Sequence, residues 1–427
     1  MRPITIMLIA GEPSGDQLGG QLASALEKAI LEFEVLPSPD VQPLRTALPP
    51  AFFGAGGPAM RKAGVEVICD LNRWATVGLF DVLGRLHHYY AAFRLLYQTA
   101  RTRQPDVIIG IDYGAFNLRL ASALRRSISR RQDWFHPWRP LFVQYVSPQV
   151  WASRPGRARQ MEQVLDLLLS ILPFEPEWFA QRAPRLPVEF VGHPLLDRWP
   201  QAPLQAPRRL GAEAPRLVLL PGSRPDEIRR HGPLVAGAWR LLKRHWPDLQ
   251  TRCVVPQQEL VARLQALKDW PAEVAIETGS AVPALLWADL ALTKSGTVTL
   301  ECALAGLPAV VFYKTAVPTY WVGRHLVSVR YLAMPNLLAQ QELYPELIQN
   351  QATPERLATA ARELWEDTTR RERICKALEK VRAALGPPGA SGRAAACILQ
   401  RLRTKPSALP AGASADALLF RPSVAAR

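Results

Sequence analysis

The chain is poor in cysteine, and its cysteines lack the spacing of a metal site or a disulfide framework. The five are odd in number and include no Cys-x-x-Cys pair: Cys69, Cys253, Cys302, Cys375 and Cys397. A disulfide scaffold and a structural zinc site are therefore not indicated, and a reducing cytoplasm is the expected compartment.

Long apolar runs are also missing. The longest uncharged and mostly apolar stretch covers about residues 302–313 and contains a Gly-Leu-Pro break. Because a membrane-spanning helix needs about 20 apolar residues, any membrane contact is expected to be peripheral. The apolar run from Ile4 to Ala10 is short for a signal sequence and is predicted to be the first strand.

Acidic residues are scarce relative to basic ones. The chain has 52 Lys and Arg against 37 Asp and Glu, a formal net charge of +15. Such an excess favours an anionic partner: nucleic acid, anionic lipid or a phosphorylated substrate. Neither base-stacking aromatics on a sheet face nor a recognition helix is found, so nucleic acid is not expected.

The usual motifs for nucleotide cofactors and metal ions are absent. Gly11, Gly15 and Gly19 follow the first strand, but they form neither Gly-x-Gly-x-x-Gly nor a Walker A motif. That argues against nicotinamide cofactors and ATP, and the glycines serve either close ligand approach or tight packing. The chain also has no Asp-x-Asp for Mg²⁺. We therefore expect no cofactor and no metal.

What the chain does have is repeated alternation of apolar strands and amphipathic helices, interrupted once. The interruption is the Pro/Ala/Gln/Arg-rich stretch from Trp199 to Arg216, after which the alternation restarts. This pattern predicts an α/β protein with two doubly wound, Rossmann-like parallel-sheet domains facing a cleft. The expected division is 1–200 for the N-terminal domain, 201–215 for a hinge, 216–386 for the second domain, 387–403 for a last helix and 404–427 for a disordered tail.

Two strand-to-helix turns in the second half are suited to a nucleotide diphosphate sugar. The first holds Gly222, Ser223 and Arg224, where free backbone N–H groups and a guanidinium can grip phosphate oxygens. The second runs from Lys294 through Ser295, Gly296 and Thr297, and its helix carries Glu301 for sugar or ribose hydroxyls. The alternative is an ordinary βα turn with a surface arginine.

Polar side chains in the first half follow predicted strands, where open α/β sheets bind ligands. Glu12, Ser14 and Asp16 share the turn after the first strand. Asp112 follows Ile108–Ile111 and can act as a general base, although a lone Asp more commonly caps a helix. His193 follows another strand, and either stabilises a phosphate or anchors the hinge.

One apolar segment is a candidate membrane contact. Trp74, Val77, Leu79 and Phe80 lie in a run flanked by arginines, and either dip into a bilayer surface or pack in the core. A basic cluster is either a solvated face or an attraction for anionic lipid, and it comprises Arg119, Arg125, Arg126, Arg130 and Arg131.

Together the motifs resemble the lipid-A-disaccharide synthase family, over about residues 4–402. In chain order they are Ala-Gly-Glu-Pro-Ser-Gly-Asp (10–16), Gly-Ala-Gly-Gly-Pro-x-Met (54–60), Val-Gly-Leu-Phe-Asp-Val-Leu-Gly-Arg-Leu (77–86), Ser-Pro-Gln-Val-Trp-Ala-x-Arg (147–154), Leu-Pro-Phe-Glu (172–175), Val-Gly-His-Pro-Leu (191–195), Leu-Leu-Pro-Gly-Ser-Arg (219–224), Lys-Ser-Gly-Thr-x-Thr-Leu-Glu (294–301), Pro-Asn-Leu-Leu-Ala (335–339) and Gly-Ala-Ser-Gly-Arg-Ala-Ala (389–395).

The resemblance implies a GT-B glycosyltransferase whose last helix crosses back onto the first domain. It implies a UDP-linked diacylglucosamine donor, a diacylglucosamine 1-phosphate acceptor, and peripheral association with the anionic cytoplasmic face of a bacterial inner membrane; a homodimer is compatible with it. It assigns the donor to Gly222, Ser223, Arg224, Ser295, Gly296, Thr297 and Glu301. We expect Arg224 to stabilise the departing UDP. We place Ser14, Asp16, His193 and Asn336 on the acceptor side of the cleft.

One departure from the family pattern concerns the general base. The family often has two acids three residues apart where this chain has Asp112 and Ala115. Asp112 is therefore the leading candidate base, with Glu12 second, for inverting attack by the acceptor 6-hydroxyl. Two alternatives stay open: a UDP-sugar epimerase of the same fold, and a non-catalytic relative that binds sugar nucleotide or lipid.

Overall fold

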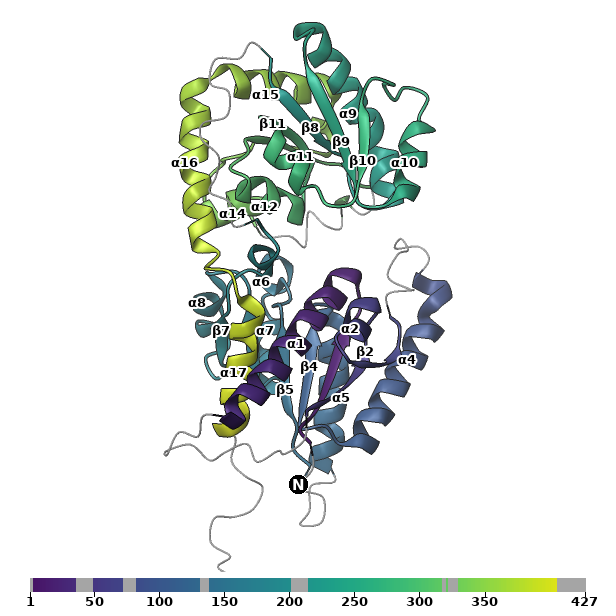
Figure 1. The fold of residues 1–427 in the computed structure, drawn as a ribbon, viewed down its shortest axis with the longest axis vertical. Coiled ribbons are helices and arrows are strands. Elements are labelled where there is room, and N and C mark those ends of the chain that lie inside the picture. The colour runs from purple at the N-terminus through teal and green to yellow at the C-terminus, as the bar shows by residue number, and fades with distance from the viewer. Residues whose placement is uncertain are drawn as a thin grey trace, which may run out of the picture.

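The computed structural model describes residues 3–35, 49–71, 82–130, 138–200, 214–316, 320–321 and 329–404. Three of the predicted features lie outside these ranges, wholly or in large part. They are the membrane segment with Trp74, Val77, Leu79 and Phe80, the hinge, and the tail. The described residues form two α/β bodies, one above the other in Figure 1.

The first body is built on a seven-stranded parallel sheet in the order β3-β2-β1-β4-β5-β6-β7. Its strands are β1 (Thr5–Ala10), β2 (Ala51–Ala55), β3 (Glu66–Cys69), β4 (Val107–Ile111), β5 (Leu141–Tyr145), β6 (Leu167–Ser170) and β7 (Val188–Phe190). Its helices are α1 (Pro13–Val35), α2 (Pro58–Lys62), α4 (Val82–Arg103), α5 (Gly114–Arg130), α6 (Val150–Ser153), α7 (Arg157–Val164), α8 (Glu175–Ala180) and the 3-10 turn η2 (Pro194–Asp197).

The second body has a six-stranded parallel sheet in the order β10-β9-β8-β11-β12-β13. Its strands are β8 (Arg216–Leu220), β9 (Gln250–Val255), β10 (Ala275–Thr278), β11 (Leu290–Lys294), β12 (Ala309–Tyr313) and β13 (Glu346–Ile348). Its helices are α9 (Pro225–His245), α10 (Gln258–Gln265), α11 (Val282–Trp287), α12 (Thr297–Leu304), α14 (Met334–Ala339), α15 (Pro354–Glu366), α16 (Thr368–Ala384) and the 3-10 turn η3 (Gln349–Gln351).

Central strands of both sheets are apolar along their whole length because helices cover both faces. Every residue of β4 is buried, for example. In the first body, α1, α2 and the last helix α17 (Ala390–Thr404) pack on one face, and α4, α5 and α7 pack on the other. The predicted pair of doubly wound parallel sheets is confirmed.

The last helix crosses back to the first body, as the family resemblance implies. In Figure 1, α16 descends along the second body and α17 continues beside α1. The Asp197 carboxylate accepts hydrogen bonds from the N–H groups of Gly389 (2.6 Å) and Ala390 (3.1 Å) at the start of α17. Arg393 donates from Nε to the Val191 carbonyl at 2.8 Å. The crossing helix is therefore fixed at its N-terminus by the segment that leaves the first sheet.

A small apolar cluster joins the two bodies directly. Trp151 and Leu172 of the first body pack with Leu337 of the second. The Trp151 indole also donates at 3.0 Å to Glu175, a buried carboxylate whose pKa burial raises to about 7. Residues that follow β5 and β6 of the first body therefore contact α14 of the second.

Each sheet reverses its strand order once, and these reversals place the functional loops. The reversal lies between β1 and β4 in the first sheet and between β8 and β11 in the second. In open α/β sheets, ligands bind beyond the carboxyl ends of the strands at this switch point. Glu12 and Asp112 follow β1 and β4, and the two predicted phosphate turns follow β8 and β11.

Candidate functional site

Asp112 lies in a strained turn at the carboxyl end of β4. Both Asp112 and Tyr113 have left-handed backbone angles, with φ of 50° and 37°. This region is uncommon for non-glycine residues, and a surrounding structure has to hold them there. Burial raises the pKa of the Asp112 carboxyl, although a hydrogen bond from the Tyr113 N–H opposes the shift. The carboxylate is thus fixed in place and more basic than an exposed one.

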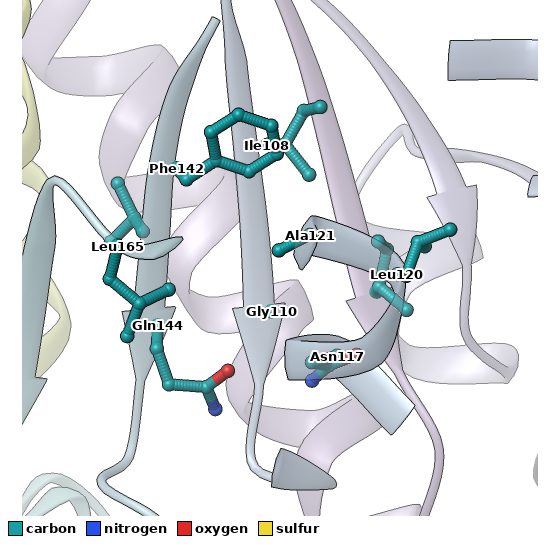
Figure 2. Close-up of a pocket in the computed structure, with 10 residues that line it drawn as sticks. Ile108, Gly110, Asn117, Leu120, Ala121, Phe142, Gln144 and Leu165 are labelled. Carbon is teal, nitrogen blue, oxygen red and sulfur yellow. The ribbon is translucent and has the colours of Figure 1, made fainter. Parts of the chain in front are cut away.

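Two buried side-chain amides hold the backbone of Asp112 in place, an arrangement called the clamp below. The Asp112 carbonyl accepts hydrogen bonds from Gln144 Nε2 at 2.8 Å and Asn117 Nδ2 at 3.0 Å. Figure 2 shows these side chains on either side of Gly110, lining a small pocket. A Cβ on Gly110 would lie 2.6 Å from Gln144 Oε1, so this position has room for no side chain. The clamp was not foreseen, because it depends on residues from three different elements.

Glu12 lies within electrostatic reach of both other predicted catalytic residues. Burial raises the pKa of the Glu12 carboxyl, the Asp112 carboxylate raises it further, and Arg224 lowers it. Arg224 comes from the second body, so the three charges come together across the boundary between the bodies. The structure thus groups residues that are far apart in sequence at one place.

Tyr113 packs against the turn that carries Glu12. Its pKa is raised by burial and by a hydrogen bond with Tyr89 on α4. Its ring lies against Gly11, where a Cβ would be 2.4 Å from Tyr113 Cδ1. Gly19 is likewise packed against Met60. Gly11 in the turn and Gly19 in α1 are therefore both packed closely against side chains.

The turn after β8 is organised by Glu227, a residue the sequence did not single out. The Ser223 N–H donates to Glu227 Oε2 at 2.7 Å, and Lys294 Nζ lies 3.2 Å from Glu227 Oε1. Gly222 has a φ of +142°, and a Cβ there would lie 2.5 Å from Glu227 Oε2. Glu227 therefore links the two predicted phosphate turns. Burial opposes its ionisation, but Lys294 and the Ser223 N–H outweigh burial and lower its pKa.

A buried histidine supports the same turn from behind. His231 Nδ1 lies 2.7 Å from the Pro221 carbonyl, and Nε2 accepts from the Lys314 N–H at 3.1 Å. Burial lowers the pKa of His231. Nε2 also lies 3.0 Å from the Lys314 carbonyl, so the ring bridges the Pro221 carbonyl that begins the turn and the backbone of Lys314.

The turn after β11 brings Glu301 toward the first body. Gly296 caps α12, and Thr299 Oγ1 donates to the Gly296 carbonyl at 2.7 Å. Burial raises the pKa of Glu301, and the charge of Arg198 opposes the shift. Arg198 also donates a hydrogen bond to Gln17 on α1. Arg198, which the sequence did not single out, therefore acts on Glu301 electrostatically from the first body.

Two residues predicted for the acceptor side are buried and hydrogen-bonded within the fold. Asn336 has no exposed surface, and its amide bonds to the backbone of Leu343 and Tyr344 and to Glu346. Asp16 is 4% exposed, and accepts from three backbone N–H groups at the start of α2. In this structure Asn336 therefore holds a loop together and Asp16 caps a helix.

The other two predicted acceptor residues differ from each other. Ser14 is exposed in the first turn of α1. His193 is buried, and its Nδ1 accepts from the Leu195 N–H at 3.2 Å. Burial, followed by the charge of Arg198, lowers the pKa of His193 to about 4. Its backbone N–H also donates to Leu385 near the crossing helix. A neutral ring in this position favours anchoring over binding of phosphate.

Removal of the Asp16 cap is expected to destabilise the protein. Asp16→Ala would leave the N–H groups of Gly57, Ala59 and Met60 without their acceptor, at a cost of about 2 kcal/mol in the free energy of unfolding. Urea unfolding would measure the loss. Ser14→Ala on the same helix is the control, and equal stability of the two variants would contradict the capping role.

Two properties of the described residues bear on the site. Among the described helices, none is both long and apolar enough to cross a membrane. Within the same ranges, no group of three or more His, Cys, Asp or Glu side chains is placed to hold a metal ion.

Sequence comparison finds the same family that the motifs suggested. A family model described as lipid-A-disaccharide synthetase matches residues 6–400. A lipid-A-disaccharide synthase of Azotobacter vinelandii is 40% identical over 372 residues, covering 84% of this chain and 88% of the relative. One from Pseudomonas syringae pv. syringae is 36% identical over 412 residues, covering 95% and 99%.

Structural comparison finds the same fold at much lower sequence identity. The calicheamicin glycosyltransferase CalG4 aligns with a TM-score of 0.54 and 17% identity, over 95% of this chain and all of that one. UDP-GlcNAc 2-epimerase from Neisseria meningitidis, bound to UDP-GlcNAc, gives 0.53 and 11% identity over 93% and 99%. Because transferases and epimerases share this arrangement, the likeness establishes the GT-B fold and leaves the reaction to other observations.

Proposed function

The chain belongs to the lipid-A-disaccharide synthase family and is therefore a glycosyltransferase of lipid A biosynthesis, and from this premise we propose its substrates and the roles of its residues. The donor is a UDP-linked diacylglucosamine, and the acceptor is a diacylglucosamine 1-phosphate. The observation that carries the assignment is that the charges of both Asp112 and Arg224, which belong to different bodies, act on the carboxyl of Glu12.

The acceptor 6-hydroxyl attacks the anomeric carbon of the donor sugar. Its proton passes to Asp112, a new C–O bond forms at the anomeric carbon with inversion, and the bond to UDP breaks. Burial raises the pKa of Asp112, which suits a base that has to take a proton from a hydroxyl. Glu12 lies within the electrostatic influence of Asp112 and orients the acceptor.

The second body binds the donor and stabilises the leaving group. Arg224 meets the charge that develops on the departing diphosphate, as electrostatic stabilisation of a transition state requires. Glu227 holds the Gly222–Ser223 turn in shape and orients Lys294. Glu301 accepts hydrogen bonds from donor hydroxyls. It is partly buried, and burial raises the pKa of its carboxyl.

The protein meets its lipid substrates as a peripheral protein on the cytoplasmic face of the inner membrane. The excess of 15 basic charges suits an anionic lipid surface. The arginines of α5 are on the face of the sheet that α4 also covers. The sugars of both substrates then reach the boundary between the two bodies while their acyl chains stay in the membrane.

Both substrates in detergent micelles test this function directly. We expect one UDP released for each disaccharide formed, and no UDP release when the acceptor is omitted. Turnover of the UDP-sugar without acceptor would instead identify an epimerase. Binding of the UDP-sugar with no product would identify a non-catalytic relative.

A further inference from the structure

The chain between the candidate base and α7 is strongly basic. From Tyr113 to Met161 it has nine arginines, no lysine, and a single carboxylate, Asp133, which lies outside the described ranges. Two helices of this stretch, α5 and α7, pack against each other. The described part of this stretch is therefore rich in positive charge.

Three of these arginines gather around the contact of α5 and α7. Arg119 is exposed on α5, Arg154 is exposed just after α6, and Arg157 is the first residue of α7. Arg154 and Arg157 are also joined by a backbone hydrogen bond of 3.0 Å. Burial lowers the pKa of Arg157, and the charges of Arg154 and Arg119 lower it further.

None of the three makes an ion pair within the part of the chain that the structure describes. Neighbouring arginines do so: Arg125 lies 2.6 Å from Asp166, and Arg185 lies 3.2 Å from Glu162. Arg157 also stands in the first turn of α7, which is the wrong end of a helix for a cation. A bound anion would relieve both the mutual repulsion and this unfavourable placement.

The three arginines lie on segments that follow β4 and β5, the neighbouring strands whose carboxyl ends include the strand end before Asp112. Helix α5 begins at Gly114, two residues after Asp112, and Gly114 packs against Pro148 in the loop that leads to α6. Arg119 is five residues further along α5, about 7.5 Å at the rise of an α-helix. A sugar whose 6-hydroxyl reaches Asp112 can therefore extend its opposite end to these side chains.

We propose that Arg119, Arg154 and Arg157 bind the phosphate monoester of the acceptor sugar. The proposal rests on the proposed function, which gives the acceptor a phosphate at C1 and its nucleophile at C6. Guanidinium groups bind phosphate oxygens through paired hydrogen bonds, and three of them match a dianionic group. This site fixes which end of the acceptor faces the donor.

The test compares two acceptors, the 1-phosphate and the same diacylglucosamine with a free 1-hydroxyl, in neutral detergent micelles. The double variant Arg154→Ala/Arg157→Ala is expected to lose about 10- to 100-fold in kcat/KM for the phosphorylated acceptor. Its kcat/KM for the unphosphorylated acceptor and its KM for the donor are expected to stay unchanged. Arg126→Ala, two turns beyond Arg119 on α5, is the matched control and should behave as wild type.

Other outcomes overturn the proposal. An equal loss with both acceptors would mean a structural role, and no loss would mean that the phosphate binds elsewhere. Unchanged kinetics in neutral micelles, with weaker sedimentation on phosphatidylglycerol vesicles, would assign the arginines to lipid headgroups. Arg157→Lys keeps the charge and should retain part of the kcat/KM for the phosphorylated acceptor that is lost when Arg157 is replaced by alanine. Failure of the proposed function is distinct, because the wild-type protein would then make disaccharide from neither acceptor.

Discussion

Asp112→Asn is expected to lower kcat by about 10³-fold while leaving the KM for the donor nearly unchanged, which is the range for removal of a general base. Asparagine has the same shape and cannot take the proton. The hydrogen bonds to Tyr145, Asn117 and Gln144 use only the backbone of Asp112, so they survive the change. Initial rates of UDP release with both substrates saturating would measure the loss.

The pH profile separates a base from a merely structural carboxylate. Activity of the wild-type protein should fall as pH drops through the pKa of Asp112, because the base becomes protonated. Burial raises that pKa, so the acid limb should lie above the usual range of an aspartate. The residual activity of Asp112→Asn should lack this limb. An unchanged limb in that variant, together with its loss in Glu12→Gln, would move the base to Glu12.

The strand ends that carry the site were predictable from sequence because buried parallel strands are continuous apolar runs. Fully apolar runs such as Ile108–Ile111 have no solvent-facing side, and the residues that follow them lie at one edge of the sheet. Four strands lie at the edges of the two sheets: β3, β7, β10 and β13. All four are three or four residues long and at most partly buried, so they carry a weaker apolar signal than a central strand, and β3 and β13 were not predicted.

Polar residues in motifs could not be sorted from sequence into site and scaffold. Asp16 and Asn336 look like ligand-binding groups until their partners are seen, which are backbone groups of their own loops. Glu227 shows the opposite error, since an acidic residue in a first helical turn is ordinarily only a favourable charge. Its link to Lys294, 67 residues away in the chain, exists only once β8 and β11 are adjacent.

Arg224→Ala is expected to lower kcat by about 10²- to 10³-fold, the loss that follows removal of one preorganised group that stabilises transition-state charge. The Arg224 side chain makes no ion pair among the described residues, so its charge is available to the departing UDP. Arg224→Lys should recover only part of the rate, because an ammonium cannot bind two phosphate oxygens in the same plane. Rates at saturating donor, followed by UDP release, separate this loss from weaker binding.

Lys294 is the control for Arg224, because it is the other cation in the two predicted phosphate turns. Like Arg224, it is a cation in a predicted phosphate turn near the carboxyl end of a central strand. Its ammonium, however, lies 3.2 Å from Glu227 Oε1, and that carboxylate largely neutralises it. Lys294→Ala should therefore act mainly through the shape of the turn and cost less in kcat than Arg224→Ala. If Lys294→Ala cost as much or more, the leaving-group charge would belong to Lys294. Glu227 would then be a carboxylate that occupies the phosphate position until the donor displaces it.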